Sequence, residues 1–187
     1  GQPGRTLDVV AAKAAVEAAD GPVTVPISST APNMSDADFK ALIFRDVLGS
    51  ASSTFSTSNK NRTANVKLAA QFCNNVVLMP GDVFSFNGVV GERTQAMGYK
   101  PAPTYEGGKT VYTYGGGICQ VSSTLYYCTL LANLEIPQRL AHRYATAYMP
   151  YGMDATVSWG GPDYQFTNNT DYPIRIYKST NKRIIIS

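Results

Sequence analysis

The stretch from Tyr114 to Leu125 holds the residue types best suited to covalent chemistry. It reads Tyr-Gly-Gly-Gly-Ile-Cys-Gln-Val-Ser-Ser-Thr-Leu, so a run of glycines leads directly to Cys119. A cysteine in the first turn of a helix lies among unpaired N–H groups at the positive end of the helix dipole, which favours the thiolate. The thiolate is the nucleophilic form of cysteine, so this pattern favours an enzyme that forms a covalent intermediate on Cys119.

A purely structural role for this stretch is the alternative. A glycine run before a helix also makes a tight loop, and a lone cysteine is often a small buried hydrophobic residue. Gln120, Ser122, Ser123 and Thr124 nevertheless surround the thiol with hydrogen-bonding side chains, more than one helix cap requires. These residues favour catalysis, and we expect the serines to line the site or to cap the helix.

Acyl transfer on a cysteine also needs a base, a group that orients the base, and donors for the oxyanion. His142 is the only histidine in the chain, so it is the expected general base and acid, although a histidine in a strand can also be satisfied by the backbone. We expect Asp154 to hold and polarise the imidazole, as the carboxylate of a triad does. The alternative for Asp154 is a turn residue after Gly152.

The expected oxyanion hole comes from the motif itself. Its donors would be the backbone N–H groups of Gly117, Ile118 and Gln120, together with the side-chain amide of Gln120.

Three further residues are candidates for substrate binding. Arg93 and Arg139 could bind a peptide carboxylate through bidentate hydrogen bonds, or form surface ion pairs instead. Tyr114, at the start of the motif, belongs to a chain with twelve tyrosines, a residue type suited to clefts that bind sugars or peptides and also common in strands.

Composition limits the other possibilities. One histidine and no paired-cysteine spacing leave too few ligands for zinc, so we expect no metal and no cofactor. The net charge of +3 is mild and its basic residues are scattered, which argues against nucleic-acid binding. We expect Cys73 and Cys128 in the core, where an oxidising compartment would allow them to pair and leave Cys119 free.

The 187 residues, with a hydrophobic fraction of 44%, suit one folded domain and a fragment of another. No apolar run approaches the roughly 18 residues of a membrane span. Residues 1–35 have a helical pattern over 6–19 and a short strand over 23–27. We interpret them as the end of a preceding module.

Periodicity predicts the elements that position the motif. Residues 41–57 are strand-like with an interruption at Gly49, and residues 87–117 form a long loop that could serve as a wall or lid of the site. Helices are expected over 61–76 and 118–134, and strands over 83–86, 139–148, 155–159, 164–167, 173–177 and 183–186. The expected fold class is α+β, with the helix that carries Cys119 packed against an antiparallel sheet.

Residues 41–178 resemble the VanW family of bacterial cell-envelope proteins. The resemblance rests on the Gly115–Leu125 string and on ordered matches on both sides of it, which are Asn61-Arg62 with Asn65, Pro80-Gly81, Phe84-Ser85-Phe86-Asn87, Gly91 with Arg93, Gly98-Tyr99, Arg139 with His142, Tyr148 with Pro150, Gly152 with Asp154-Ala155-Thr156, and Asn168-Asn169-Thr170. Residues 1–35, through Pro3-Gly4-Arg5-Thr6-Leu7-Asp8, resemble the end of the peptidoglycan-binding domain that often precedes a VanW domain. The resemblance therefore implies a peptidoglycan-binding module over 1–35 and a catalytic domain over 36–187.

The resemblance also implies a function. It suggests an L,D-transpeptidase that takes a tetrapeptide stem as donor and an amine of a second stem as acceptor. Such a protein would work on the extracellular face of a Gram-positive cell envelope, with the full-length chain anchored in the membrane or secreted. The alternatives are a non-catalytic wall-binding module, and a cysteine amidase or endopeptidase acting on the same stem peptide.

Overall fold

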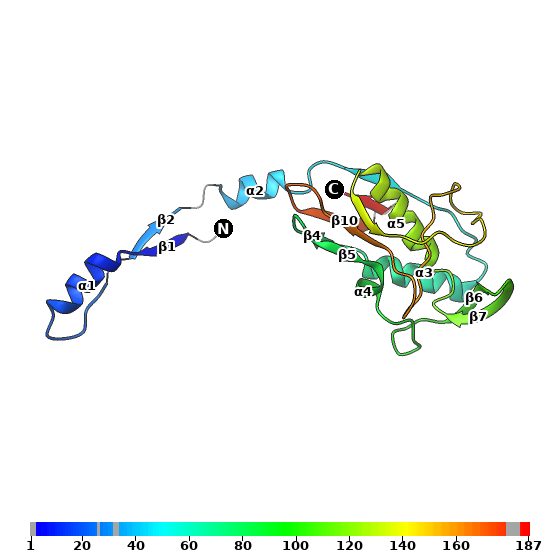
Figure 1. Cartoon of the computed structure of the whole chain (residues 1–187), viewed down its shortest axis with the longest axis horizontal. Helices are drawn as coiled ribbons and strands as arrows, with labels where there is room; N and C mark the ends of the chain where they lie inside the picture. Colours follow the sequence, from blue (N-terminus) through cyan, green and yellow to red (C-terminus); the bar gives the residue numbers. More distant parts are fainter. Residues whose placement is uncertain (1–2, 26, 32–33, 179–183) are drawn as a thin grey trace. The chain divides into compact units, whose positions relative to one another are not determined.

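The computed structural model describes residues 3–25, 27–31, 34–178 and 184–187. The chain forms two compact units, Gly1–Ile43 and Phe44–Ser187 (Figure 1). The described residues include helices and antiparallel sheets, which confirms the predicted α+β class. The functional division predicted after residue 35 remains a prediction.

In the first unit, β1 (Gly4–Leu7) pairs antiparallel with β2 (Ile27–Thr30), and α1 (Val9–Glu17) lies between them in the chain. The helix predicted over 6–19 starts later because the Asp8 carboxylate caps its N-terminus. The strand predicted over 23–27 is wrong except at Ile27, because the residues that pair with β1 are 27–30; residue 26 lies outside the described residues. A second helix, α2 (Asp36–Leu42), ends this unit.

The second unit contains a four-stranded and a three-stranded antiparallel sheet. The first has the order β3 (Gly49–Ala51), β11 (Ile184–Ile186), β10 (Ile174–Lys178), β4 (Val76–Leu78). The second has the order β5 (Val83–Ser85), β9 (Gln165–Thr167), β8 (Glu135–Gln138). Helices α3 (Lys60–Phe72), α4 (Phe86–Val90) and α5 (Cys119–Leu131) also belong to this unit (Figure 1).

Helix α5 contacts strands β3 and β11 of the four-stranded sheet. The approach is closest at Gly49, where an added Cβ would lie 2.4 Å from the carbonyl oxygen of Cys128. Gly49 thus begins β3 rather than interrupting a strand, contrary to the prediction. Only a residue without a side chain allows this contact between backbones.

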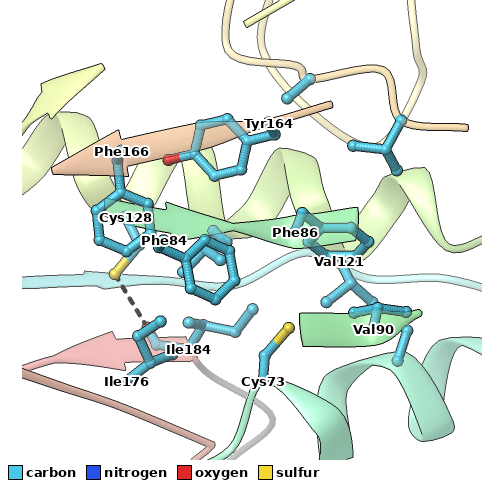
Figure 2. Close-up of a cluster of buried hydrophobic side chains, with 14 of the residues drawn as sticks. Cys73, Phe84, Phe86, Val90, Val121, Cys128, Tyr164, Phe166, Ile176 and Ile184 are labelled. Carbon is cyan, nitrogen blue, oxygen red and sulfur yellow. Dashed lines mark hydrogen bonds between the residues drawn. The ribbon is translucent and has the colours of Figure 1, made fainter. Parts of the chain in front are cut away.

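The core between these elements is aromatic and aliphatic. Phe84 and Phe166 stack across paired strands with ring centroids 4.9 Å apart, and Tyr164 is fully buried beside them (Figure 2). Cys73 and Cys128 are buried in the same cluster, as predicted, and both are free thiols. Burial raises the pKa of each to about 12, so neither thiol ionises near neutral pH.

The long loop predicted over 87–117 is wrong, because this segment contains α4 and a hairpin. Strands β6 (Pro101–Glu106) and β7 (Lys109–Tyr114) pair antiparallel through a two-residue turn (Figure 1). The turn residues Gly107 and Gly108 have φ of 58° and 81°, as a type I′ turn requires. Strand β6 contains Pro101 and Pro103, and a proline is tolerated where its missing N–H faces the outer edge of a ladder.

Residues 139–164 lack regular strands, so the strands predicted over 139–148 and 155–159 are wrong. Side chains and isolated backbone contacts satisfy this segment instead of a ladder, as described below. The strands predicted over 164–167, 173–177 and 183–186 are confirmed as β9, β10 and β11, with residue 183 outside the described residues. The helices predicted over 61–76 and 118–134 are confirmed as α3 and α5, but α3 ends at Phe72, before β4 begins at Val76, and α5 ends at Leu131.

Candidate active site

Cys119 is the first residue of α5 and is half-buried. The preceding residue, Ile118, takes the N-cap position and provides no side-chain cap. The Cys119 Sγ lies 3.4 Å from the carbonyl oxygen of Val157, to which the thiol donates. The thiol is thus at the N-terminus of a helix, as predicted, and faces the irregular segment that follows residue 139.

The glycines before Cys119 are required by the protein's own packing. A Cβ on Gly116 would lie 2.3 Å from the carbonyl oxygen of Ala102 in β6. Gly117 has a φ of 101°, and a Cβ there would lie 2.7 Å from Cγ of Arg62 in α3. The turn is therefore held closely between the hairpin and α3, which fixes where α5 and its cysteine begin.

His142 and Asp154 form a short hydrogen-bonded pair. The Nδ1 of His142 lies 2.6 Å from Oδ2 of Asp154, and the backbone N–H of His142 donates to the same oxygen over 2.6 Å. This pairing leaves Nε2 as the ring nitrogen available to the thiol, and Cys119 lies close enough to His142 to help raise the pKa of its imidazole. The residues predicted to form a Cys-His-Asp arrangement thus lie together in that order.

The surroundings favour a protonated imidazole beside an ionised carboxylate. Burial lowers the pKa of His142, but its hydrogen bonds to Cys119 and Asp154 outweigh burial, so the pKa lies above its ordinary value. Burial raises the pKa of Asp154, but the hydrogen bonds from His142 and the charges of His142 and Arg139 bring it below its ordinary value. His142 is therefore suited to accept a proton from the thiol.

Arg139 positions the carboxylate of the pair. Its Nε donates to the carbonyl oxygen of Asp154 over 2.7 Å, and its Nη2 contacts Oδ1 of Asp154 at 3.2 Å and donates to the carbonyl oxygen of Gly152 over 3.0 Å. The guanidinium also lies over the ring of Tyr126. The carboxylate that Arg139 binds here is that of Asp154, whereas the sequence suggested a substrate carboxylate.

Ser122 and Ser123 connect α5 to the segment that carries Asp154. Ser122 Oγ donates to the carbonyl oxygen of Ala155 over 2.7 Å. Ser123 Oγ donates to the carbonyl oxygen of Cys119 over 2.6 Å and accepts from the N–H of Ala155 over 3.0 Å. Both serines are buried, so they fix the distance between the nucleophile and the acid-base pair.

The side chain of Gln120 forms hydrogen bonds with the segment before α3 and with α3 itself. Its Nε2 donates to Ser53 Oγ over 3.1 Å and to the carbonyl oxygen of Thr54 over 3.0 Å, while its Oε1 accepts from Arg62 Nη2 over 2.7 Å. Because both ends of the amide are engaged, the side chain of Gln120 is not available as an oxyanion donor in this arrangement.

The backbone donors of the motif divide into two groups. The N–H groups of Ile118 and Gln120, both predicted for the oxyanion hole, donate to the carbonyl oxygens of Gly115 and Gly117. Within the part of the chain that the structure describes, the N–H groups of Gly117 and Cys119 have no protein acceptor. Gly117 and Cys119 are therefore the better candidates.

Arg93 is buried behind the motif. Its Nη1 donates to the carbonyl oxygen of Gly91 over 2.8 Å, and its Nη2 donates to Asn87 Oδ1 over 2.6 Å. A Cβ on Gly115 would lie 2.6 Å from its Cγ. Both terminal nitrogens therefore donate hydrogen bonds within the protein. Burial lowers the pKa of Arg93, and the charge of Cys119 is among those that oppose this shift.

Tyr114 lies on the exposed face of the hairpin, and its hydroxyl donates to Gln95 Oε1 over 3.1 Å. The cross-strand register places Tyr105 and Tyr112 on the same face, and both are exposed. Strand β7 ends at Tyr114, so this face of the hairpin adjoins the glycine run that precedes Cys119.

Two residues at the site were absent from the predicted set. Burial raises the pKa of Tyr148 to about 12, the charges of Cys119 and Asp154 add to this, and its side-chain hydrogen bond with Ser123 opposes it. The charge of Arg62 lowers the pKa of Tyr148, and its Nη2 donates a hydrogen bond to Gln120 Oε1. Both residues are among those that carry the family resemblance, but no spacing argument pointed to them.

An open cavity of about 350 Å³ adjoins the acid-base pair. Its lining comes from residues 139–154 and includes His142, Asp154, Tyr144, Met149 and Tyr151. The tip of the hairpin approaches this lining, since a Cβ on Gly108 would lie 3.8 Å from the hydroxyl of Tyr144. The cavity is large enough for a small peptide group beside the imidazole.

Among the residues that the structure describes, no three His, Cys, Asp or Glu side chains are grouped so as to hold a metal ion. In the same residues, no helix is long and apolar enough to cross a membrane.

Comparison with known proteins places this arrangement in a family. The model of the family described as "VanW like protein" matches residues 61–187. The chain belongs to the VanW-like family. It is 45% identical over 154 residues to a Bacillus subtilis protein named "Uncharacterized protein YoaR", covering 82% of this chain and 50% of that protein. It is 34% identical over 132 residues to the "Vancomycin B-type resistance protein VanW" of Enterococcus faecalis, covering 68% of this chain and 48% of that one.

The chain thus spans about half the length of these VanW-like relatives. No solved structure matches it. The family-model match includes Cys119, His142 and Asp154, and also the Arg62 and Tyr148 that the structure adds to the site.

Proposed function

We propose that the second unit is a cysteine-dependent L,D-transpeptidase of peptidoglycan. The observation that carries this proposal is that Cys119, at the N-terminus of α5, lies beside the hydrogen-bonded pair of His142 and Asp154. A nucleophile, a base within hydrogen-bonding reach and a carboxylate that orients the base are the parts of an acyl-transfer site. The choice of peptidoglycan as substrate rests on the VanW-like family resemblance.

In the first half-reaction, His142 accepts the thiol proton and the sulfur of Cys119 attacks the carbonyl carbon of the third stem residue. The oxyanion accepts hydrogen bonds from the N–H groups of Gly117 and Cys119. The C–N bond to the terminal D-alanine then breaks, the imidazolium gives its proton to the departing amine, and a thioester remains on Cys119.

In the second half-reaction, the amine of another stem peptide attacks the thioester and His142 accepts a proton from it. The C–S bond breaks, the proton returns to the sulfur, and a 3-3 cross-link is released. Water in place of the amine gives an L,D-carboxypeptidase. Throughout, the negative charge of Asp154 stabilises the imidazolium and Arg139 keeps the carboxylate in place.

We place this activity on the extracellular face of a Gram-positive cell envelope, with stem peptides as substrates. A relative named as a vancomycin resistance protein supports this, because a protein with that name belongs to the context of cell-wall synthesis.

One observation favours a second candidate, a wall-binding module without catalysis. The exposed tyrosines of the hairpin, Tyr105 and Tyr112, with Tyr151 beside the cavity, could bind a glycan or stem peptide whether or not chemistry follows.

The two candidates separate on turnover of a disaccharide-tetrapeptide. Mass spectrometry would follow the muropeptide products and the intact protein for the wild type, for Cys119→Ala, and for Cys73→Ala as a control that removes a buried thiol. We expect release of D-alanine with dimer formation, or a thioester adduct, in the wild type and in Cys73→Ala only. Binding of the muropeptide without turnover by any of the proteins would overturn the transpeptidase proposal in favour of the binding module.

A further inference from the structure

We propose that Arg62 binds the free C-terminal carboxylate of the donor stem peptide, so that the enzyme selects donors that end one residue beyond the scissile bond. This inference rests on the proposed function and adds to it the group that the site recognises in the donor.

The side chain of Arg62 lies across the part of the motif that contains the nucleophile. Its Cγ and Nε lie 2.7 and 3.1 Å from the position of a Cβ on Gly117, two residues before Cys119. Its Nη2 donates to Gln120 Oε1 over 2.7 Å, one residue after Cys119. Arg62 thus contacts the chain on both sides of Cys119. Its charge lowers the pKa of Tyr148, and the charge of Cys119 raises it, so both groups lie near the same phenol.

The guanidinium is oriented before any ligand arrives. The amide of Gln120 that accepts from Arg62 is itself fixed by Ser53 and Thr54. The guanidinium carbon lies 5.4 Å from the centre of the Phe55 ring, which covers one face of the group. A cation held in this way binds an anion without a further loss of side-chain freedom.

The guanidinium of Arg62 is engaged differently from those of the other two arginines of the site. Arg139 is paired with Asp154, and the terminal nitrogens of Arg93 are bonded to Gly91 and Asn87. Within the described residues, only Nη2 of the Arg62 guanidinium donates a hydrogen bond, so Nε and Nη1 remain for a ligand. A guanidinium with two free N–H groups matches a carboxylate, which it binds bidentately.

The chemistry of the donor supplies such a carboxylate close to the reacting bond. In a tetrapeptide stem, a single Cα joins the nitrogen of the scissile bond to the terminal carboxylate of D-alanine. A fifth residue would move that carboxylate away by about 3.5 Å. A guanidinium fixed against the turn that precedes Cys119 therefore favours a tetrapeptide over a longer or capped stem.

The test compares a disaccharide-tetrapeptide that ends in a free carboxylate with the same molecule that ends in a carboxamide. The wild type should process the carboxamide with a kcat/KM lower by about 10- to 100-fold, mainly through KM, because a hydrogen-bonded charge pair contributes about 1.5–3 kcal/mol. Arg62→Met should lower kcat/KM for the carboxylate to a similar extent and should treat both donors alike. Lys67→Met, which removes an exposed positive charge from the same helix, should keep the wild-type preference.

Equal kcat/KM for the two donors in the wild type would overturn the role of Arg62 and leave the transpeptidase proposal standing. Discrimination that persists in Arg62→Met would also overturn it. If the wild type turns over neither donor, the proposed function fails and the inference fails with it. Because the wild-type comparison needs no variant, the proposal stays testable even if Arg62→Met does not fold.

Discussion

Cys119 and the His142–Asp154 pair are held by two regions that are built differently. Cys119 belongs to a glycine turn and a regular helix, fixed by backbone packing against the hairpin and α3. His142 and Asp154 belong to residues 139–157, which lack regular secondary structure and are fixed by the side chains of Arg139, Ser122 and Ser123. A hydrogen-bonded pair of side chains can thus be fixed without a sheet ladder when charged and hydroxyl side chains satisfy the backbone.

The largest expected effect comes from removing the imidazole of the irregular region. His142→Ala should lower kcat/KM by about 10³-fold, because general acid-base catalysis is lost while the backbone N–H of residue 142 can still bond to Asp154. Alkylation of Cys119 by iodoacetamide near neutral pH should slow as well. Activity within tenfold of the wild type, in a variant that unfolds at the same temperature, would remove His142 from the mechanism.

A smaller loss of kcat/KM than in His142→Ala is expected for Asp154→Asn, because the carboxylate orients the imidazole and stabilises its charge without taking the proton itself. The variant should also lower the pKa of His142, because the hydrogen bond and the charge of Asp154 both raise it in the wild type. The chain has a single histidine, so one NMR resonance reports this titration directly. An unchanged histidine pKa would mean that Asp154 does not act on the imidazole.

The same carboxylate has a consequence for stability at acid pH. The pKa of Asp154 is lowered by folding from its ordinary 3.8, so its stabilisation is present above that pH and is lost as the pH falls through the folded-state value. The dependence of the free energy of unfolding on pH should therefore be flatter below about pH 4 in Asp154→Asn than in the wild type.

The stability of the region around Cys119 should depend on backbone crowding instead of charge. Gly116→Ala should lower the free energy of unfolding by about 1–3 kcal/mol in urea titrations, because its Cβ would meet the carbonyl oxygen of Ala102. Gly81→Ala is a matched control with a φ of 84° and open space around it, where only backbone strain, about 1 kcal/mol, should appear. A smaller loss of unfolding free energy for Gly116→Ala than for Gly81→Ala would show that the hairpin moves to accommodate the added methyl group at little cost.

The smallest effect tests the link between the two regions. Ser123→Ala should lower the free energy of unfolding by about 1 kcal/mol, because its hydroxyl bonds to the backbone of both Cys119 and Ala155. It should also lower kcat severalfold, while Ser52→Ala, at an exposed position, should change neither. A stability loss without any change in kcat would show that the two regions are positioned independently.

The regular region could be predicted well from the sequence. The glycine run and the amphipathic pattern after it located the start of α5 to within a residue, because helix periodicity and N-terminal signals are local, whereas the helix ends three residues earlier than predicted. The three strands near the C-terminus were found for the same reason. The hairpin β6–β7 was missed because residues 87–117 are rich in glycine and tyrosine and show little periodicity, although the Gly107-Gly108 turn was a usable signal.

The irregular region could be predicted only in its residues and not in its structure. His142 and Asp154 were identified as residue types, yet the segment around them was expected to form strands. What replaces the strands is a set of contacts such as that of Arg139 with the carbonyl oxygen of Asp154, which depend on tertiary packing. The places of Arg62 and Gln120 could not be predicted either, because residues 53–62 and 120 meet only in the folded unit.

The contact of Gln120 with Ser53 and Thr54 bears on how this protein is divided for expression. The family match begins at residue 61, so a recombinant fragment cut at that boundary would omit β3 and both acceptors of the Gln120 amide nitrogen. Such a fragment would leave an edge of the four-stranded sheet unpaired and would free the guanidinium of Arg62 to reorient. A minimal fragment should therefore begin ahead of Gly49, near the start of the second unit at Phe44.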